Sequence, residues 1–233
     1  MSSKNTSKDF EKFSSEYPEN AYIKKLVFED GSKSSPRKEN DLGVDLIYLT
    51  QHQFAAKWFF QILEANKGKI AGRDRPGLFH CLDVGSQFHF VSTLAAFANY
   101  IISDPSLNLV TPEGKSKVHA PDAGILWSTE EAQHLKSIES NAIRVVTSLH
   151  AIEHFGLGRY GDTIDPEGDI KGIKNFNRVL SPSGFFIGSV PIELAGRERV
   201  SFNRNRIYSV GLIRKILNDT GFEIIDDVVA SSS

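Results

Sequence analysis

The sequence predicts an α/β fold: a doubly wound, mostly parallel sheet with helices on both faces. Apolar runs of strand length alternate along the 233 residues with stretches of helical periodicity, a pattern typical of a parallel sheet. Several of these runs are rich in β-branched residues, as expected for strands that are covered on both faces. Some of them end at acidic or glycine residues, which is where open α/β sheets place their ligand sites.

Length and composition favour one globular domain. With 40% hydrophobic and 24% charged residues, we expect a polar, partly disordered N-terminal arm over residues 1–40 and one α/β domain over 41–233. The formal charge of −2 gives no field that would attract nucleic acid. The single Cys81 lies in an apolar run, so we expect a buried thiol and a reducing, cytoplasmic setting. No apolar segment approaches the roughly 20 residues of a membrane span.

The first long helix is predicted to begin at Thr50. Thr50 would be its N-cap, and Gln53 would complete a capping box. The apolar residues that follow have the spacing of one helical stripe: Phe54, Ala55, Trp58, Phe59, Ile62 and Leu63. This stripe predicts packing on a sheet rather than recognition of a base or cofactor.

Next comes a predicted βαβ unit. Its parts are a strand over 78–84, a turn at Gly85 and Ser86, a helix over 90–98 and a strand over 100–102. Asp83 closes the first strand and Asp104 follows the second. Carboxylates at strand ends suit ribose hydroxyls, and a glycine turn allows close approach, so the unit suits a nucleoside such as adenosine. It is equally compatible with a purely structural turn.

The rest of the chain continues the alternation. We expect a third strand near 125–128 followed by a helix start at Glu130 and Glu131, and then a fourth strand over 143–149. A helix with Asp169 as N-cap and a fifth strand over 185–190 should follow. The chain is then expected to continue with a polar loop over 197–206, a helix from 210 and a final strand over 222–229.

Reactive side chains are concentrated between Ala142 and Asp169. The fourth strand is followed by His150, Glu153, His154, Arg159, Tyr160, Asp162, Asp165, Glu167 and Asp169. Glycines separate these residues, so the segment cannot continue a buried strand and predicts a functional loop. A structural interpretation stays open, in which Glu153 and His154 brace the loop and the aspartates form Asx turns.

Several strings resemble one known superfamily. Residues 77–229 resemble class I S-adenosylmethionine-dependent methyltransferases. The resemblance rests on LDVGS at the first turn, an acid that closes the second strand, and the strings TSLHAIEHFG, NRVLSPSGFFIGSVP and TGFEIIDD. HAIEHFGLGRYGDTIDPEGD followed by FNRNRIYS resembles a bacterial branch linked to surface-polysaccharide and sugar modification. The resemblance implies a Rossmann-like methyltransferase sheet, here with the final antiparallel strand missing or truncated.

The resemblance also implies S-adenosyl-L-methionine as cofactor and a role for each matching residue. Asp83, Gly85 and Ser86 would form the cofactor turn, Asp104 would take the ribose hydroxyls, Glu131 would lie near the adenine, and Ser148 and His150 would line the methionine end. The chain departs from the superfamily at Gln87 and His89, where further glycines are usual.

The function expected from these features is O-methylation of a sugar or glycan. A histidine is suited to remove the acceptor's proton because its ordinary pKa lies near neutrality. His150 is the first candidate for this general base and His154 is the second. The residues expected to hold the small-molecule or glycan acceptor are Glu153, Arg159, Tyr160, Asp162, Asp165, Asn203 and Arg206. We expect no metal.

Two rival functions remain open. Residues 150–154 match His-x-x-Glu-His, a zinc-peptidase motif that needs a helix to bring both histidines to one face. Here the motif directly follows a strand and leads into Gly156, so a helix could last barely a turn. The second rival is a module that binds a nucleoside or sugar on a methyltransferase-like fold without catalysis, because fold does not fix function.

Overall fold

The computed structural model describes residues 3–28, 46–66, 79–106 and 125–231. Its centre is a five-stranded sheet whose strands are β2 (His80–Val84), β3 (Asn99–Ser103), β4 (Ile125–Ser128), β5 (Ile143–Leu149) and β6 (Leu180–Ser189). The spatial order is β4-β3-β2-β5-β6, and every neighbouring pair is parallel. The chain reverses its direction across the sheet between β2 and β5, so this is a doubly wound sheet with its switch point there. The predicted fold class is confirmed.

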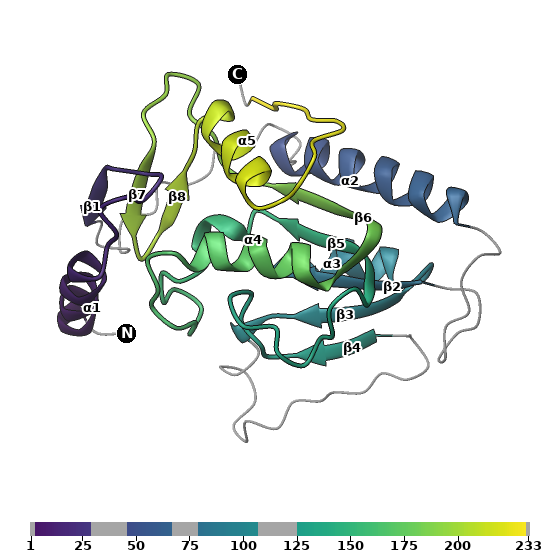
Figure 1. Cartoon of the computed structure of the whole chain (residues 1–233), viewed down its shortest axis with the longest axis horizontal. Helices are drawn as coiled ribbons and strands as arrows, with labels where there is room; N and C mark the ends of the chain where they lie inside the picture. The colour runs from purple at the N-terminus through teal and green to yellow at the C-terminus, as the bar shows by residue number, and fades with distance from the viewer. Residues whose placement is uncertain (1–2, 29–45, 67–78, 107–124, 232–233) are drawn as a thin grey trace.

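Helices cover both faces of this sheet (Figure 1). On one face lie α4 (Gly168–Val179) and α5 (Val210–Asp219), and on the other lie α2 (Leu46–Ala65) and α3 (Phe88–Leu94). Successive strand residues supply the two faces: Leu82 and Val146 belong to one buried cluster, and Cys81 and Val145 belong to the other. The Cys81 thiol is fully buried, as predicted.

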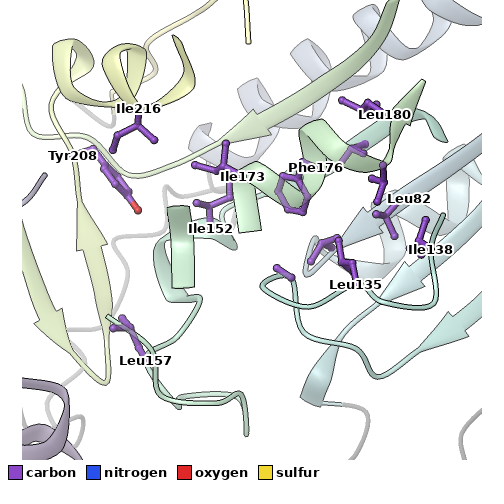
Figure 2. Close-up of a cluster of buried hydrophobic side chains, with 14 of the residues drawn as sticks. Leu82, Leu135, Ile138, Ile152, Leu157, Ile173, Phe176, Leu180, Tyr208 and Ile216 are labelled. Atoms are coloured by element: carbon purple, nitrogen blue, oxygen red, sulfur yellow. The ribbon is translucent and has the colours of Figure 1, made fainter. Parts of the chain in front are cut away.

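Figure 2 shows the core beneath α4 and α5. Ile173 and Phe176 of α4 are fully buried, and Phe176 lies toward Leu82 and Leu180 of the sheet. Ile152, which follows β5, belongs to the same cluster. Because the loop after β5 is itself anchored in this core, its position is fixed relative to the sheet.

A smaller sheet lies beside the central sheet (Figure 1). It contains β1 (Leu26–Phe28) parallel to β7 (Arg199–Phe202), with β8 (Asn205–Ile207) antiparallel to β7. Helix α1 (Ser3–Ser15) packs beside it, with the Phe13 and Phe202 rings 4.9 Å apart. A partly disordered arm was expected over residues 1–40. Within it, residues 3–28 include α1 and β1, and Phe13 is buried against a partner that is distant in sequence. Residues 29–40 lie outside the described residues.

Several local expectations are wrong. Helix α2 begins at Leu46, and Thr50 lies inside it and donates to the Leu46 carbonyl (2.8 Å) instead of capping the helix. Residues 197–206, expected as a polar loop, contain the β7–β8 hairpin. Residues 222–229 form no strand; Asp226 and Asp227 there bond Trp58 and Arg214 through their side chains.

Other expectations hold. The apolar stripe of α2 packs on the sheet, with Ala55, Phe59 and Ile62 buried in the cluster that contains Val145. Among the described residues no strand follows α5, in line with the missing final antiparallel strand. None of the described helices has both the length and the hydrophobicity that crossing a membrane requires.

Candidate functional site

A pocket opens at the carboxyl ends of β2, β3 and β5, and we call it the strand-end pocket. Its volume is about 170 Å³. It is lined by Val84, Gly85, Asp104, Pro105, Ser106, Glu131, Ala132, Gln133, His150, Ala151, His154, Phe155, Tyr160 and Asp162. Half of these had been predicted as site residues: Gly85, Asp104, Glu131, His150, His154, Tyr160 and Asp162. The fold therefore brings together candidates from four separate segments of the chain.

The turn after β2 is held by a buried carboxylate. Asp83 is fully buried and accepts hydrogen bonds from the Ser86 amide (3.1 Å) and the Thr147 hydroxyl (2.6 Å). Burial raises the pKa of Asp83 to about 6, although these hydrogen bonds oppose the rise. Gly85 has φ +75°, and a Cβ added there would lie 2.8 Å from the Ala151 Cβ. Asp83 thus shapes the turn, and Gly85 lets the loop after β5 approach it.

Two carboxylates, Asp104 and Glu131, line the pocket. Asp104 follows β3, and its Oδ1 accepts from the Ser106 amide (2.8 Å). Glu131 accepts from the amide and hydroxyl of Thr163 (3.0 Å each) and from Gln133 Nε2 (2.8 Å). Glu131 therefore braces the loop around Thr163 as well as lining the pocket, and the residues around it form turns rather than the expected helix.

His150 lies directly at the end of β5. Its φ of 51° is in the left-handed region, which is uncommon for residues other than glycine. Its amide donates to the Ser189 carbonyl and to the Ser189 hydroxyl oxygen (3.0 Å each), and its ring lies 5.4 Å from the Tyr48 ring. The turn that ends β5 is thus fixed by β6, and the imidazole is left at the pocket wall.

His154 and Glu153 form a buried pair in a one-turn helix, η3 (Ile152–His154). The His154 Nδ1 is 2.6 Å from the Arg204 carbonyl, which can only accept, so the proton resides on Nδ1 and Nε2 carries the lone pair. Glu153 Oε1 lies 3.7 Å from that Nε2, and its Oε2 has no hydrogen-bond partner among the described residues. Burial raises the pKa of Glu153 to about 8 and lowers the pKa of His154 to about 4. Both side chains are therefore mainly neutral at pH 7.

The zinc-peptidase motif lacks the helix that it requires. Because η3 spans only three residues, it cannot place His150 and His154 on one helical face. In the described part of the chain, no group of three or more His, Cys, Asp or Glu side chains is arranged to hold a metal ion.

Arg206, predicted to bind substrate, is instead buried inside the protein with 2% of its surface exposed. Its Nη1 and Nη2 donate to the carbonyls of Phe155 (2.6 Å) and Pro166 (3.0 Å), and its Nε lies 3.4 Å from Asp169 Oδ1. Asp169 also accepts from the Tyr208 hydroxyl (2.9 Å). Asp169 is therefore not the N-cap of α4 but the carboxylate partner of a buried arginine.

The remaining predicted residues lie outside the pocket wall and make internal contacts. Ser148 Oγ donates to the Val84 carbonyl (2.8 Å), and Asp165 Oδ2 pairs with Lys171 (2.6 Å). Arg159 Nη1 donates to the Arg204 carbonyl (3.1 Å), and Asn203 occupies the hairpin turn with φ 60°. Glu153 is buried as described above.

Sequence reasoning missed several residues of the wall. Ser106 and Pro105 directly follow Asp104, so proximity in sequence could have suggested them. Gln133 is 7% exposed and donates to the Thr163 carbonyl (3.1 Å), a contact over thirty residues that no local pattern encodes.

Solved structures of known proteins share this architecture. The chain superimposes on the cyclase SpnF with a TM-score of 0.51 at 16% identity, covering 95% of this chain and 71% of that one. It also matches a phosphoethanolamine N-methyltransferase of Haemonchus contortus bound to S-adenosylhomocysteine (TM-score 0.46, 17% identity, 71% of this chain and 37% of that one). A third match is a SAM-dependent methyltransferase of Thermotoga maritima (TM-score 0.42, 16% identity, 76% and 75%). The match to SpnF shows a shared Rossmann-like α/β fold.

Sequence comparison is less informative. Residues 125–233, just under half of the chain, match a family model described as a Caenorhabditis protein of unknown function, DUF268. No curated protein matches the sequence.

Proposed function

We propose that the protein is an S-adenosylmethionine-dependent methyltransferase that binds its cofactor in the strand-end pocket. The observation that carries the proposal is the arrangement of the Gly85 turn, Asp104 and His150 around one pocket at the switch point of a methyltransferase-like sheet. The carboxylate of Asp104 suits the two ribose hydroxyls, and the backbone at Gly85 suits close contact with the amino-acid portion of the cofactor.

The donor set fits the cofactor in part. Asp83 and Ser148 are committed to internal hydrogen bonds, so we assign them to holding the turn rather than to contacting the ligand. Because Glu131 already accepts hydrogen bonds from Thr163 and Gln133, we assign it only a secondary role near the adenine. The residues that would hold the cofactor are Gly85, Asp104 and, at its edge, Tyr160.

His150 is the better candidate for the base. Bound S-adenosylmethionine would supply the methyl group from its sulfonium, with the neutral thioether S-adenosylhomocysteine as the leaving group. His150 would take the acceptor's hydroxyl proton on its imidazole. His154 is less suited, because burial lowers its pKa to about 4 and its Nδ1 is committed to the Arg204 carbonyl.

The sugar acceptor loses much of its support. Of the side chains expected to hold sugar hydroxyls, Glu153, Asp165 and Arg206 are buried or paired within the protein. Tyr160 and Asp162 still line the pocket, but Asp162 accepts from the amides of Gly158 (3.2 Å) and Tyr160 (3.1 Å). We therefore retain O-methylation but not the sugar as its acceptor.

A second candidate is a protein of this fold that transfers no methyl group. The volume of about 170 Å³ is below the roughly 300–1,000 Å³ typical of pockets that enclose drug-sized ligands. SpnF, which shares the fold, is a cyclase, so the fold alone does not set the reaction.

Calorimetry with S-adenosylhomocysteine tests the cofactor assignment. We expect saturable binding to the full chain and none of comparable strength for NAD. Asp104→Asn keeps an acceptor oxygen for the Ser106 amide but removes the charge, and should weaken binding roughly tenfold or more. Glu139→Gln changes an exposed acid outside the pocket and should bind as the wild type does. Equal affinity of wild type and Asp104→Asn would move the site elsewhere.

A further inference from the structure

A second hollow, which we call the edge groove, lies along the outer edge of the parallel sheet. It is bounded by α2, the edge strand β6, α5 and residues 222–230, and its volume is about 390 Å³. This volume is within the range of about 300–1,000 Å³ that is typical of small-molecule sites. His150 lines both the edge groove and the strand-end pocket, so the proposed base is a wall residue of both hollows.

The edge groove is elongated and mostly apolar. On α2 its lining runs from Ile47 through Phe54 to Ile62, which at 1.5 Å per residue is about 22 Å along the helix axis. Ile213 and Leu217 of α5 line it as well. Apolar side chains of residues 222–230 continue the lining to the surface, where Ile225 is 60% exposed, Val228 53% and Val229 47%.

The end of the edge groove next to His150 is polar. Gln51 is 7% exposed, and its Oε1 accepts from the Ser189 hydroxyl (2.6 Å), whose oxygen in turn accepts from the His150 amide. Gln51 Nε2 is buried and has no hydrogen-bond partner among the described residues. A buried donor without a partner is unfavourable, so a ligand oxygen at this end would be stabilised there.

Three of the four charged side chains that line the edge groove are in ion pairs, and the fourth is the carboxylate Glu223. Arg214 Nη2 lies 2.9 Å from Asp227 Oδ2, and Asp226 accepts from Trp58 Nε1 (2.9 Å) and pairs with Lys57 (3.4 Å). With these charges compensated, the mouth favours a neutral ligand over a phosphorylated or strongly acidic one.

We infer that the edge groove holds the methyl acceptor, and that this acceptor is an elongated, mostly apolar small molecule with a hydroxyl group at its inner end. The hydroxyl oxygen accepts from Gln51 Nε2, and its proton faces His150. The inference rests on the proposed function, because it takes the strand-end pocket as the cofactor site. It replaces the sugar acceptor with an apolar alcohol.

The test measures binding without turnover. The full chain is titrated with the neutral apolar dye N-phenyl-1-naphthylamine, followed by displacement with decanol or with methyl β-glucoside. We expect saturable dye binding that decanol reverses and the glucoside does not. Ile225→Glu places a charge at the exposed mouth and should weaken dye binding about tenfold, whereas Leu194→Glu, at an exposed site outside the groove, should not.

Gln51→Met tests the polar end with a side chain of similar size. It should leave dye affinity unchanged and weaken decanol between about twofold and tenfold, the contribution of one neutral hydrogen bond. Dye binding that is not saturable, or equal in Ile225→Glu and wild type, overturns the inference even if S-adenosylhomocysteine binds. If the dye binds as expected but S-adenosylhomocysteine does not bind at all, both the acceptor role and the proposed function are overturned. The edge groove is then only a site for an apolar ligand.

Discussion

The protonation state of Glu153 can be measured through its effect on stability. Its pKa is raised from 4.5 to about 8, chiefly by burial, so between these values the folded protein holds a proton that the unfolded chain has released. A folded-state pKa raised above the unfolded value gives stability that is fully present below pH 4.5 and is lost as pH rises to about 8. At about 1.4 kcal/mol per pH unit, the loss approaches about 5 kcal/mol.

Glu153→Gln removes this titration while keeping the shape of the protonated side chain. The measurement is urea denaturation of both proteins at intervals from pH 5.5 to 8, where wild type should lose about 3 kcal/mol relative to the variant. A pH-independent offset of about 1–3 kcal/mol is expected as well, since the new amide donor faces the unpaired position of Oε2. The slope, not the offset, therefore carries the prediction.

An ionised Glu153 paired with a protonated His154 would give the opposite slope. In that case the folded-state pKa of Glu153 would be depressed, and wild type would lose stability relative to the variant as pH falls. Glu139→Gln, an exposed control, should show no pH-dependent difference from wild type. Parallel curves for wild type and Glu153→Gln would refute the buried neutral pair.

Two further predictions concern the base and the buried ion pair. In the variant His150→Asn, asparagine tolerates the left-handed backbone at φ 51°. The variant should keep S-adenosylhomocysteine affinity within about threefold but lower methyl transfer to an apolar alcohol by about 10²–10⁴-fold. Unchanged turnover would remove His150 as the base. Asp169→Asn should reduce the free energy of unfolding by about 3–5 kcal/mol in urea denaturation, because Arg206 would stay buried without its carboxylate. A loss well below 1 kcal/mol would show that the carbonyls of Phe155 and Pro166 suffice for Arg206.

The central sheet could be predicted from the sequence because its signals are local. Each strand is a short apolar run, and the residue that ends it is polar or glycine, as at Val84–Gly85 and Leu149–His150. Parallel strands bring their carboxyl ends to one edge, so Asp104 and His150 could be placed in one site without knowledge of the contacts between them.

The smaller sheet could not be predicted because its signals are non-local. Arg206 has the residue type of an exposed or ligand-binding side chain, and its burial depends on Asp169 and two carbonyls far away in the sequence. Helix α1 is polar along most of its length, and it joins the core through the packing of Phe10 and Phe13 on Phe202. Neither pairing leaves a local pattern.

These non-local contacts determine the shape of the candidate site. The loop after β5 is tied to the β7–β8 hairpin at three points: His154 Nδ1 and Arg159 Nη1 meet the Arg204 carbonyl, and Arg206 donates to the Phe155 carbonyl. The hairpin is held in turn by β1 and α1 at the other end of the chain. Arg159 and Arg206, which were expected to bind substrate, therefore hold the path of the loop instead, while the Arg204 carbonyl fixes the His154 tautomer. His150 lines both hollows.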